Sequence, residues 1–339
     1  MTSRSNIPLL VAFVMGALVS GAAIGIGGRG GRSRGSHDAS STSHLPADPL
    51  AYVPAGARGI AVADVDRLRR AHVLAEWFGA PAADEPCEAR LLRRVRSVAI
   101  AVGGGLDQVG VAFAGDLPQT DLVACARSRV SPNSVMERGN YRGIELMRLG
   151  PRAQNDLLPS SSVSEIVYLP SGVVLAGSFE MVRRMIDRGM SPGGSDVPTA
   201  ATELRRRLGN GYDATLVFEV PRETDHADAD PIASMMAHVR GVAVGLRAGD
   251  GLDVNALFAC DDYDSPREVA DAMGRLRDGF AEQLRLPSLA EPLRRARIDR
   301  RATEVDVSTS VTADEMTALS ALARTMLTEP SAPTTPPAR

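Results

Sequence analysis

The stretch Asp225-His226-Ala-Asp228-Ala-Asp230 gathers side chains that could bind a metal ion. Carboxylate oxygens and an imidazole nitrogen suit a hard or borderline cation, and a bound cation can activate water for hydrolysis. The EF-hand pattern is absent, because the stretch has neither the turn glycine nor the final glutamate. The other interpretation is a solvated loop in which Asp228 or Asp230 caps the following helix. A metal-dependent hydrolase using the acidic loop 225–230 is therefore one hypothesis for the function.

Two glycine-containing strings match catalytic motifs but lack the elements that those motifs require. Gly25–Gly30 fits G-x-G-x-x-G, yet a dinucleotide site needs a strand before it, and here an apolar segment runs into a Ser/Gly-rich stretch. Gly189–Gly193 fits G-x-S-x-G, yet a predicted helix precedes the serine and a proline follows it. No spacing supports a catalytic triad of Cys125, His72 and a carboxylate, and His238, just before a predicted strand, favours a structural role. These residues favour a protein without catalytic activity and without a cofactor.

The basic side chains are all arginine, and several are clustered in the sequence. They could contact phosphates or anionic headgroups, which makes binding to an anionic surface a further alternative function. The 41 acidic residues balance the 38 basic ones, so solvated faces are the simpler interpretation. A net charge of −3 predicts no nucleic-acid partner. The clusters are Arg93-Arg94-Arg96, Arg205–Arg207, Arg294-Arg295-Arg297 and Arg300-Arg301.

The three cysteines, Cys87, Cys125 and Cys260, allow at most one internal disulfide. Their spacing matches no zinc pattern. One interpretation is that they are small buried hydrophobic residues. If the globular body of the chain, about residues 49–328, folds in an oxidising compartment, the expected bridge is Cys87–Cys125.

Residues 7–28 carry no charge and follow a short N-terminal flank, residues 1–6. As a helix this stretch would be about 33 Å long, enough to cross a bilayer. It is either a retained single-pass anchor or a signal peptide cleaved near Ser20 and Ala22. Its G-x-x-x-G string could pair two such helices into a homodimer. The Gly/Ser-rich tether 29–48 and the Pro-rich tail 329–339 are expected to be disordered.

The charges around the apolar stretch leave its topology open. Arg29, Arg32 and Arg34 follow it, so the positive-inside rule alone would place the body in the cytoplasm. An export-like start and a long polar tether favour a body outside the cytoplasm. We therefore expect a single-pass membrane protein with an extracytoplasmic body, and secretion after cleavage is the alternative.

The body repeats itself. Val95–Val102 matches Val239–Leu246, and Val111–Asp116 matches Ala256–Asp261 in the same order. Upstream of these segments, Gly59–Asp64 matches Ala214–Glu219. Repetition at this scale predicts a duplicated supersecondary unit. We expect two α+β repeats, 49–190 and 203–328, joined by a linker over 191–202.

Each repeat is predicted to run β-α-β-β-α-β, the order of a ferredoxin-like split βαβ unit. Hairpins dominate, so the sheets should be mostly antiparallel, with helices on one face.

Three helix starts carry capping signals. Ser178 is expected to cap a helix over Phe179–Arg188 that Gly189 stops. Ser265 opens a capping box with Glu268. Thr312 and Glu315 open another, for a helix over 313–327.

The opening of the body, Leu45–Asp48 with Ala51–Ala55 and Asp64–Leu68, resembles that of exported bacterial α+β domains of unknown function. The resemblance covers about 25 residues and implies location and architecture but no activity. Together with the sequence patterns, it favours a membrane-anchored envelope protein that acts as a non-catalytic binding or scaffolding module for an unidentified protein partner.

Overall fold

The computed structural model describes residues 45–71, 87–104, 108–129, 134–151, 164–191, 199–220, 231–283 and 287–319. The apolar stretch 7–28, the acidic loop 225–230 and the tail 329–339 lie outside the described residues. Within those ranges, no helix has the length and apolar character needed to span a bilayer.

The described residues fall into two compact units. The first unit runs up to Val62 and continues from the helix that begins at Cys87 to Thr199. Residues 63–71 belong to the second unit together with everything described from Ala200 onward. The second unit therefore includes a helix that follows the first strand of the body, and this helix matters for the candidate site.

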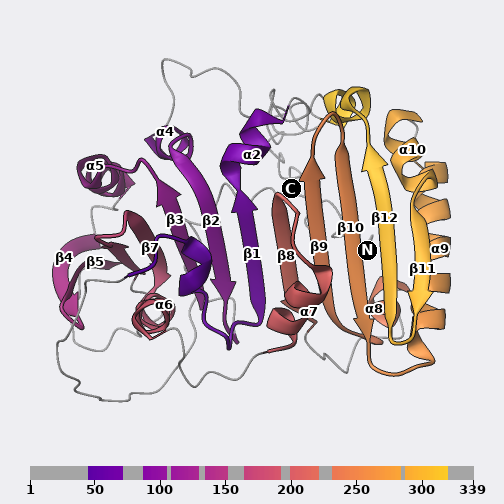
Figure 1. Cartoon of the computed structure of the whole chain (residues 1–339), viewed down its shortest axis with the longest axis horizontal. Coiled ribbons are helices and arrows are strands. Elements are labelled where there is room, and N and C mark those ends of the chain that lie inside the picture. Colours follow the sequence, from indigo (N-terminus) through magenta and orange to yellow (C-terminus); the bar gives the residue numbers. More distant parts are fainter. Residues whose placement is uncertain are drawn as a thin grey trace, which may run out of the picture. The chain divides into compact units, whose positions relative to one another are not determined.

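The first unit is an antiparallel sheet with strands in the order β1-β2-β3-β7-β6-β5-β4 (Figure 1). Its helix α6 (Phe179–Met190) packs on β7 and β3. The strands are β1 (Gly59–Asp64), β2 (Val95–Val102), β3 (Val109–Gly115), β4 (Ser134–Tyr141), β5 (Ile144–Pro151), β6 (Ser164–Tyr168) and β7 (Val173–Ser178). The other helical elements are η1 (Pro49–Tyr52), α4 (Cys87–Leu92) and α5 (Gln119–Arg129).

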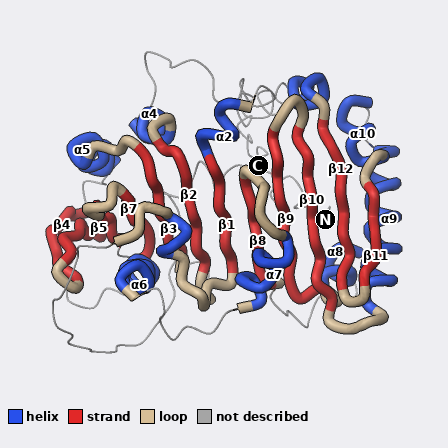
Figure 2. The backbone as a smooth tube through the Cα atoms, in the orientation of Figure 1, coloured by secondary structure: helices blue, strands red, loops and turns tan. Residues whose placement is uncertain are grey.

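The second unit is an antiparallel sheet with strands in the order β8-β9-β10-β12-β11. The strands are β8 (Ala214–Glu219), β9 (Val239–Ala248), β10 (Leu252–Cys260), β11 (Arg297–Arg301) and β12 (Glu304–Val311). The helices are α2 (Val65–Arg70), α7 (Ala200–Leu208), α8 (Pro231–Met236), α9 (Ser265–Gln283) and α10 (Pro287–Arg294), drawn in blue beside the red strands in Figure 2.

The mixed α+β class and the antiparallel pairing are as predicted, but the ferredoxin-like strand order is wrong. That order would hold β8 and β9 parallel, with a hairpin strand between them. Instead β8 pairs directly with β9, and Phe218 lies opposite Val242 in an antiparallel ladder. The ladder continues past the end of β8, where the Val220 N–H donates to the Arg240 carbonyl at 3.1 Å. Since β9 fills the position beside β8, no other strand can insert there.

The two hairpins that the repeat predicts have the same register. In the first, Val95 pairs with Gly115 and the next pair is Ser97 with Ala114, so Arg96 is an extra, bulged residue. In the second, Val239 pairs with Cys260 and the next pair is Gly241 with Ala259, so Arg240 is bulged. A bulge bends a strand and breaks pairing at a fixed place. Its recurrence at equivalent positions means that the sequence match reflects matching local structure.

Helices cover both faces of the second sheet, contrary to the expectation of one covered face. On one face, Val242 packs in a buried cluster with Val269 of α9. On the other, a Cβ added at Gly241 would meet the side chain of Leu204 in α7. Neighbouring residues of a strand point to opposite faces, so α7 and α9 lie on opposite sides, and α7 is in front of β8 and β9 in Figure 1.

Two of the predicted caps differ in the structure. Ser178 has the extended backbone of a cap, yet its side chain makes no cap hydrogen bond, and its buried Oγ has no hydrogen-bond partner within the described ranges. Helix α6 continues through Gly189, where a Cβ would overlap the ring of Tyr52, so this glycine allows close packing and does not end the helix. At α9 the Ser265 N–H and Oγ both donate to Asp262 Oδ1 at 2.7 Å, so Asp262 supplies the acceptor at this helix start.

The third cap is confirmed. The Thr312 N–H donates to Glu315 Oε2 at 2.8 Å, and the Glu315 N–H donates back to Thr312 Oγ1 at 3.4 Å. Residues 313–319 are helical, and the rest of the predicted helix lies outside the described residues.

Candidate functional site

The predicted metal ligands Asp225, His226, Asp228 and Asp230 lie outside the described residues. In the part of the chain that the structure covers, no three or more His, Cys, Asp or Glu side chains gather in a way that could hold a metal ion. His238 lies in this part, with its Nε2 3.3 Å from Glu268 Oε2.

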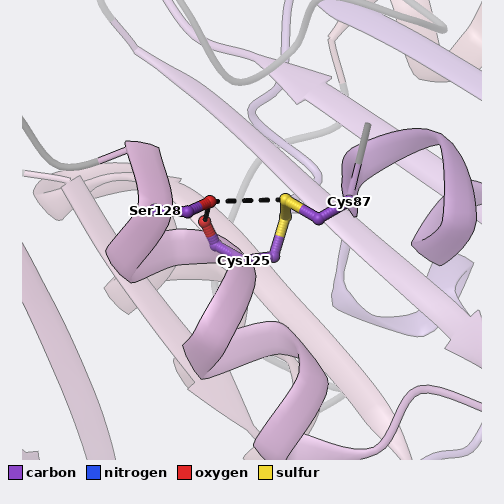
Figure 3. Close-up of a disulfide and its surroundings, with 3 residues drawn as sticks. All are labelled: Cys87, Cys125 and Ser128. Carbon is purple, nitrogen blue, oxygen red and sulfur yellow. Dashed lines mark hydrogen bonds between the residues drawn. A yellow bond between two sulfur atoms is a disulfide. The ribbon is translucent and has the colours of Figure 1, made fainter. Parts of the chain in front are cut away.

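Cys87 and Cys125 form the predicted disulfide, which joins α4 to α5 (Figure 3). The Ser128 Oγ donates to the Cys125 carbonyl at 2.8 Å and lies 3.5 Å from the Cys87 sulfur. Because both sulfurs are bonded, Cys125 cannot serve as a nucleophile. The bridge instead joins the helix that precedes β2 to the helix that follows β3.

Cys260 is the remaining cysteine, and it is buried with a free thiol. Burial, followed by the nearby carboxylates of Asp261 and Asp262, raises its pKa to about 11. The thiol therefore stays protonated at neutral pH, which removes the reactivity that a catalytic cysteine needs.

Most of the clustered arginines that the structure describes form ion pairs with nearby carboxylates. Arg94 lies 2.7 Å from Asp121, and Arg295 lies 2.7 Å from Glu315. In the same way, Arg206 and Arg207 both pair with a carboxylate of their own helix. Charges satisfied in this way contribute little to a continuous anion-binding surface.

An open pocket of about 550 Å³ lies in the second unit, where α2 meets the ends of β8 and β9. Its walls carry three arginines against two aspartates, which leaves one net positive charge. The charged lining residues are Arg67, Arg70, Asp213, Arg247 and Asp250.

Asp213 joins the walls of this pocket. Its side chain is 8% exposed, and its Oδ2 accepts a hydrogen bond from the Ala248 N–H at 2.8 Å. Its Oδ1 lies 3.6 Å from Arg67, which also lies 3.4 Å from Asp64. The Asp213 carboxylate therefore fixes α2 against the end of β9 and neutralises much of the Arg67 charge.

Arg247 is held from two sides. Its Nε donates to the Gly211 carbonyl at 3.0 Å, and its guanidinium lies 5.5 Å from the centre of the Tyr212 ring. The Tyr212 hydroxyl accepts a hydrogen bond from Asn255 at 2.7 Å. The ring covers Gly245, where any Cβ would collide with it. These contacts orient Arg247 and leave its terminal nitrogens without a protein acceptor among the described residues.

Arg70 and Asp250 complete the polar lining, and both are exposed. Neither forms an ion pair with another described residue. The pocket thus presents guanidinium groups of Arg70 and Arg247 whose donors are not all paired with the residues that the structure describes. Sequence reasoning missed this set because α2 and the β9–β10 turn are far apart in the chain, and the only local signal was the Gly/Asp-rich turn itself.

No protein-family model and no curated protein matches the chain. Among solved structures, it is similar to TP0453 in crystal form III, with 11% identity and a TM-score of 0.47 over 81% of this chain and 98% of that chain. Crystal form I of TP0453 gives 11% identity and a TM-score of 0.42, over 81% of this chain and 97% of that chain.

Proposed function

We propose that this chain is a non-catalytic binding module of the bacterial envelope, anchored by residues 7–28, whose second unit binds its partner at the pocket between α2 and the β9–β10 turn. The observation that carries the proposal is the preorganised arrangement around Asp213 and Arg247. Both carboxylate oxygens of Asp213 contact the pocket walls: Oδ2 accepts from the Ala248 N–H, and Oδ1 pairs with Arg67. Arg247 is oriented by Gly211 and Tyr212, and no other described residue accepts a hydrogen bond from its terminal nitrogens.

The chemistry of the lining supports binding more than catalysis. A guanidinium donates hydrogen bonds but does not give up its proton at neutral pH, so it is a poor general base. The buried carboxylate of Asp213 is already occupied by Arg67 and a backbone N–H. Neither a histidine nor a cysteine lies among the pocket residues. Such a site recognises a partner group and leaves its bonds intact.

The disulfide supports the proposed location of the body. Disulfides persist in oxidising compartments and are rare in the reducing cytosol. A bridge between Cys87 and Cys125 therefore fits an extracytoplasmic body on a membrane anchor. Protease accessibility in intact cells, compared with spheroplasts, tests this part directly. Protection of the body in spheroplasts would contradict it.

The binding role is tested by cross-linking the full-length chain in membranes and capturing it after solubilisation. We expect wild type to recover a specific protein partner and the Arg70→Gln/Arg247→Gln double variant to lose it. Arg206→Gln is the matched control, because Arg206 is an exposed arginine of α7 outside the pocket. Circular dichroism checks that every variant is folded. Equal recovery by wild type and the double variant would overturn the proposal, as would no recovery above background.

A further inference from the structure

Arg70 and Arg247 form no ion pair with another described residue, so their guanidinium groups indicate which ligand the pocket suits. Arg70 projects from α2, and Arg247 projects from the end of β9, so the two guanidinium groups reach the pocket from different elements. Arg67 adds positive charge from the same helix but is engaged by Asp64 and Asp213. The site therefore offers hydrogen bonds from more than one direction to an anionic group.

This geometry favours phosphate over carboxylate. A carboxylate is planar, and one arginine fork satisfies both of its oxygens. A phosphate monoester has three free oxygens in a tetrahedral arrangement, so it can accept from two arginines on separate walls. A phosphate monoester also carries a charge of about −1.5 to −2 at neutral pH. A pocket with an excess of arginine therefore attracts it more strongly than it attracts a singly charged carboxylate.

We propose that the pocket binds a phosphate monoester group, with Arg70 and Arg247 as its direct ligands. This inference rests on the proposed function, because it names the group that the same pocket recognises in a partner. Asp250 also lines the pocket, and its carboxylate can accept a hydrogen bond from a hydroxyl or amino group of the ligand and would repel a second anionic group.

Calorimetric titration of the detergent-solubilised full-length chain with inorganic phosphate tests the proposal. We expect saturable binding in wild type, at least tenfold weaker binding in Arg70→Gln and in Arg247→Gln, and unchanged binding in the control Arg206→Gln. Acetate, the carboxylate probe, should bind at least tenfold more weakly than phosphate. No saturable phosphate binding in wild type, or equal phosphate binding by the pocket variants, overturns the proposal.

Two soluble probes identify the source of the phosphate group. O-phosphoserine represents the phosphate monoester of a modified protein, and short-chain phosphatidic acid represents a lipid. Binding of either one that is lost in Arg247→Gln supports the proposal. Binding of neither, with phosphate alone retained, overturns the assignment to an ester.

Failure of this inference can be told apart from failure of the proposed function. If phosphate does not bind but the double variant still loses its protein partner, the ligand class is wrong and the binding role stands. If phosphate binds at the pocket but the double variant keeps its partner, the phosphate site stands and the proposed partner site is wrong.

Discussion

The carboxylate of Glu165 is fully buried in the first unit and accepts a hydrogen bond from Arg148 Nε at 3.0 Å. The two residues lie directly opposite each other on β6 and β5. Arg183 of α6 approaches the same oxygen at 3.5 Å and stacks over the Phe179 ring at 3.7 Å. The other carboxylate oxygen, Oε2, accepts no hydrogen bond from any residue that the structure describes. A charge buried this completely is tolerable only while its partners remain.

Arg148→Met should therefore destabilise the protein by about 3 kcal/mol, because it removes the hydrogen-bonded partner of a buried carboxylate and leaves only the longer ion pair with Arg183. Urea unfolding of the oxidised protein measures this loss. The control Arg138→Met removes an arginine whose side chain is 85% exposed in its pair with Glu145, so it should cost less than about 1 kcal/mol. Combining Arg148→Met with Glu165→Met should recover part of the loss. Equal effects of the two single variants would refute this account of Glu165.

The disulfide should contribute about 2–4 kcal/mol, since it closes a loop with a sequence separation of 38 residues. The double variant Cys87→Ser/Cys125→Ser should unfold at lower urea, and a reducing agent should lower the stability of wild type but not of the variant. Thiol titration of the denatured, unreduced protein should detect one free thiol. Three thiols in protein purified without reductant would contradict the bridge.

The elements that the sequence predicted well are those whose signal is local. Strands β2 and β9 are runs of apolar β-formers that end in glycine-rich turns, and the Thr312–Glu315 box needs only residues within one turn. The strand β11 was missed because it is a polar edge strand, Arg-Ile-Asp-Arg-Arg, with little hydrophobic alternation. The polar edge strand β4 was missed for the same reason.

The pocket could not be predicted, because its parts are joined by contacts between distant segments. Asp213 binds Arg67 and the Ala248 N–H, which lie on opposite sides of it in the sequence. The predicted ferredoxin-like strand order was wrong for the same reason, because strand pairing also depends on contacts between distant segments. Nothing local in the sequence of β8 indicates that its neighbour is β9, because the apolar residues of both strands fit either the direct antiparallel pairing of the structure or the split βαβ order that was expected.

Asp262 should anchor the start of α9. Its Oδ1 accepts from the N–H groups of Asp264 and Ser265 and from the Ser265 hydroxyl, and the bonds from Ser265 hold the pKa of Asp262 below its usual value. Asp262→Ala should lower the melting temperature, whereas the control Asp264→Ala, two residues along, should change it little. The pKa is depressed in the folded state, so the stabilisation is present above the ordinary carboxyl pKa and is lost as the pH falls through the folded value. A melting temperature of Asp262→Ala that tracks wild type from pH 7 to pH 3 would show that this carboxylate does not hold the helix.

Cys260 should make stability fall at alkaline pH. Burial raises its pKa to about 11 from an ordinary value of 9.0, so between these values the unfolded thiol ionises while the folded one does not. The unfolded state is then favoured, and the contribution of Cys260 to stability is lost as the pH rises from 9.0 toward about 11. Urea midpoints of wild type should decline more steeply over this range than those of Cys260→Ala, which lacks the thiol. Native wild type should also react with iodoacetamide at pH 8 about a hundredfold more slowly than a model thiol, since the thiolate fraction falls by that factor. Parallel pH profiles for the two proteins, together with rapid alkylation, would mean that the thiol ionises as freely as one in water.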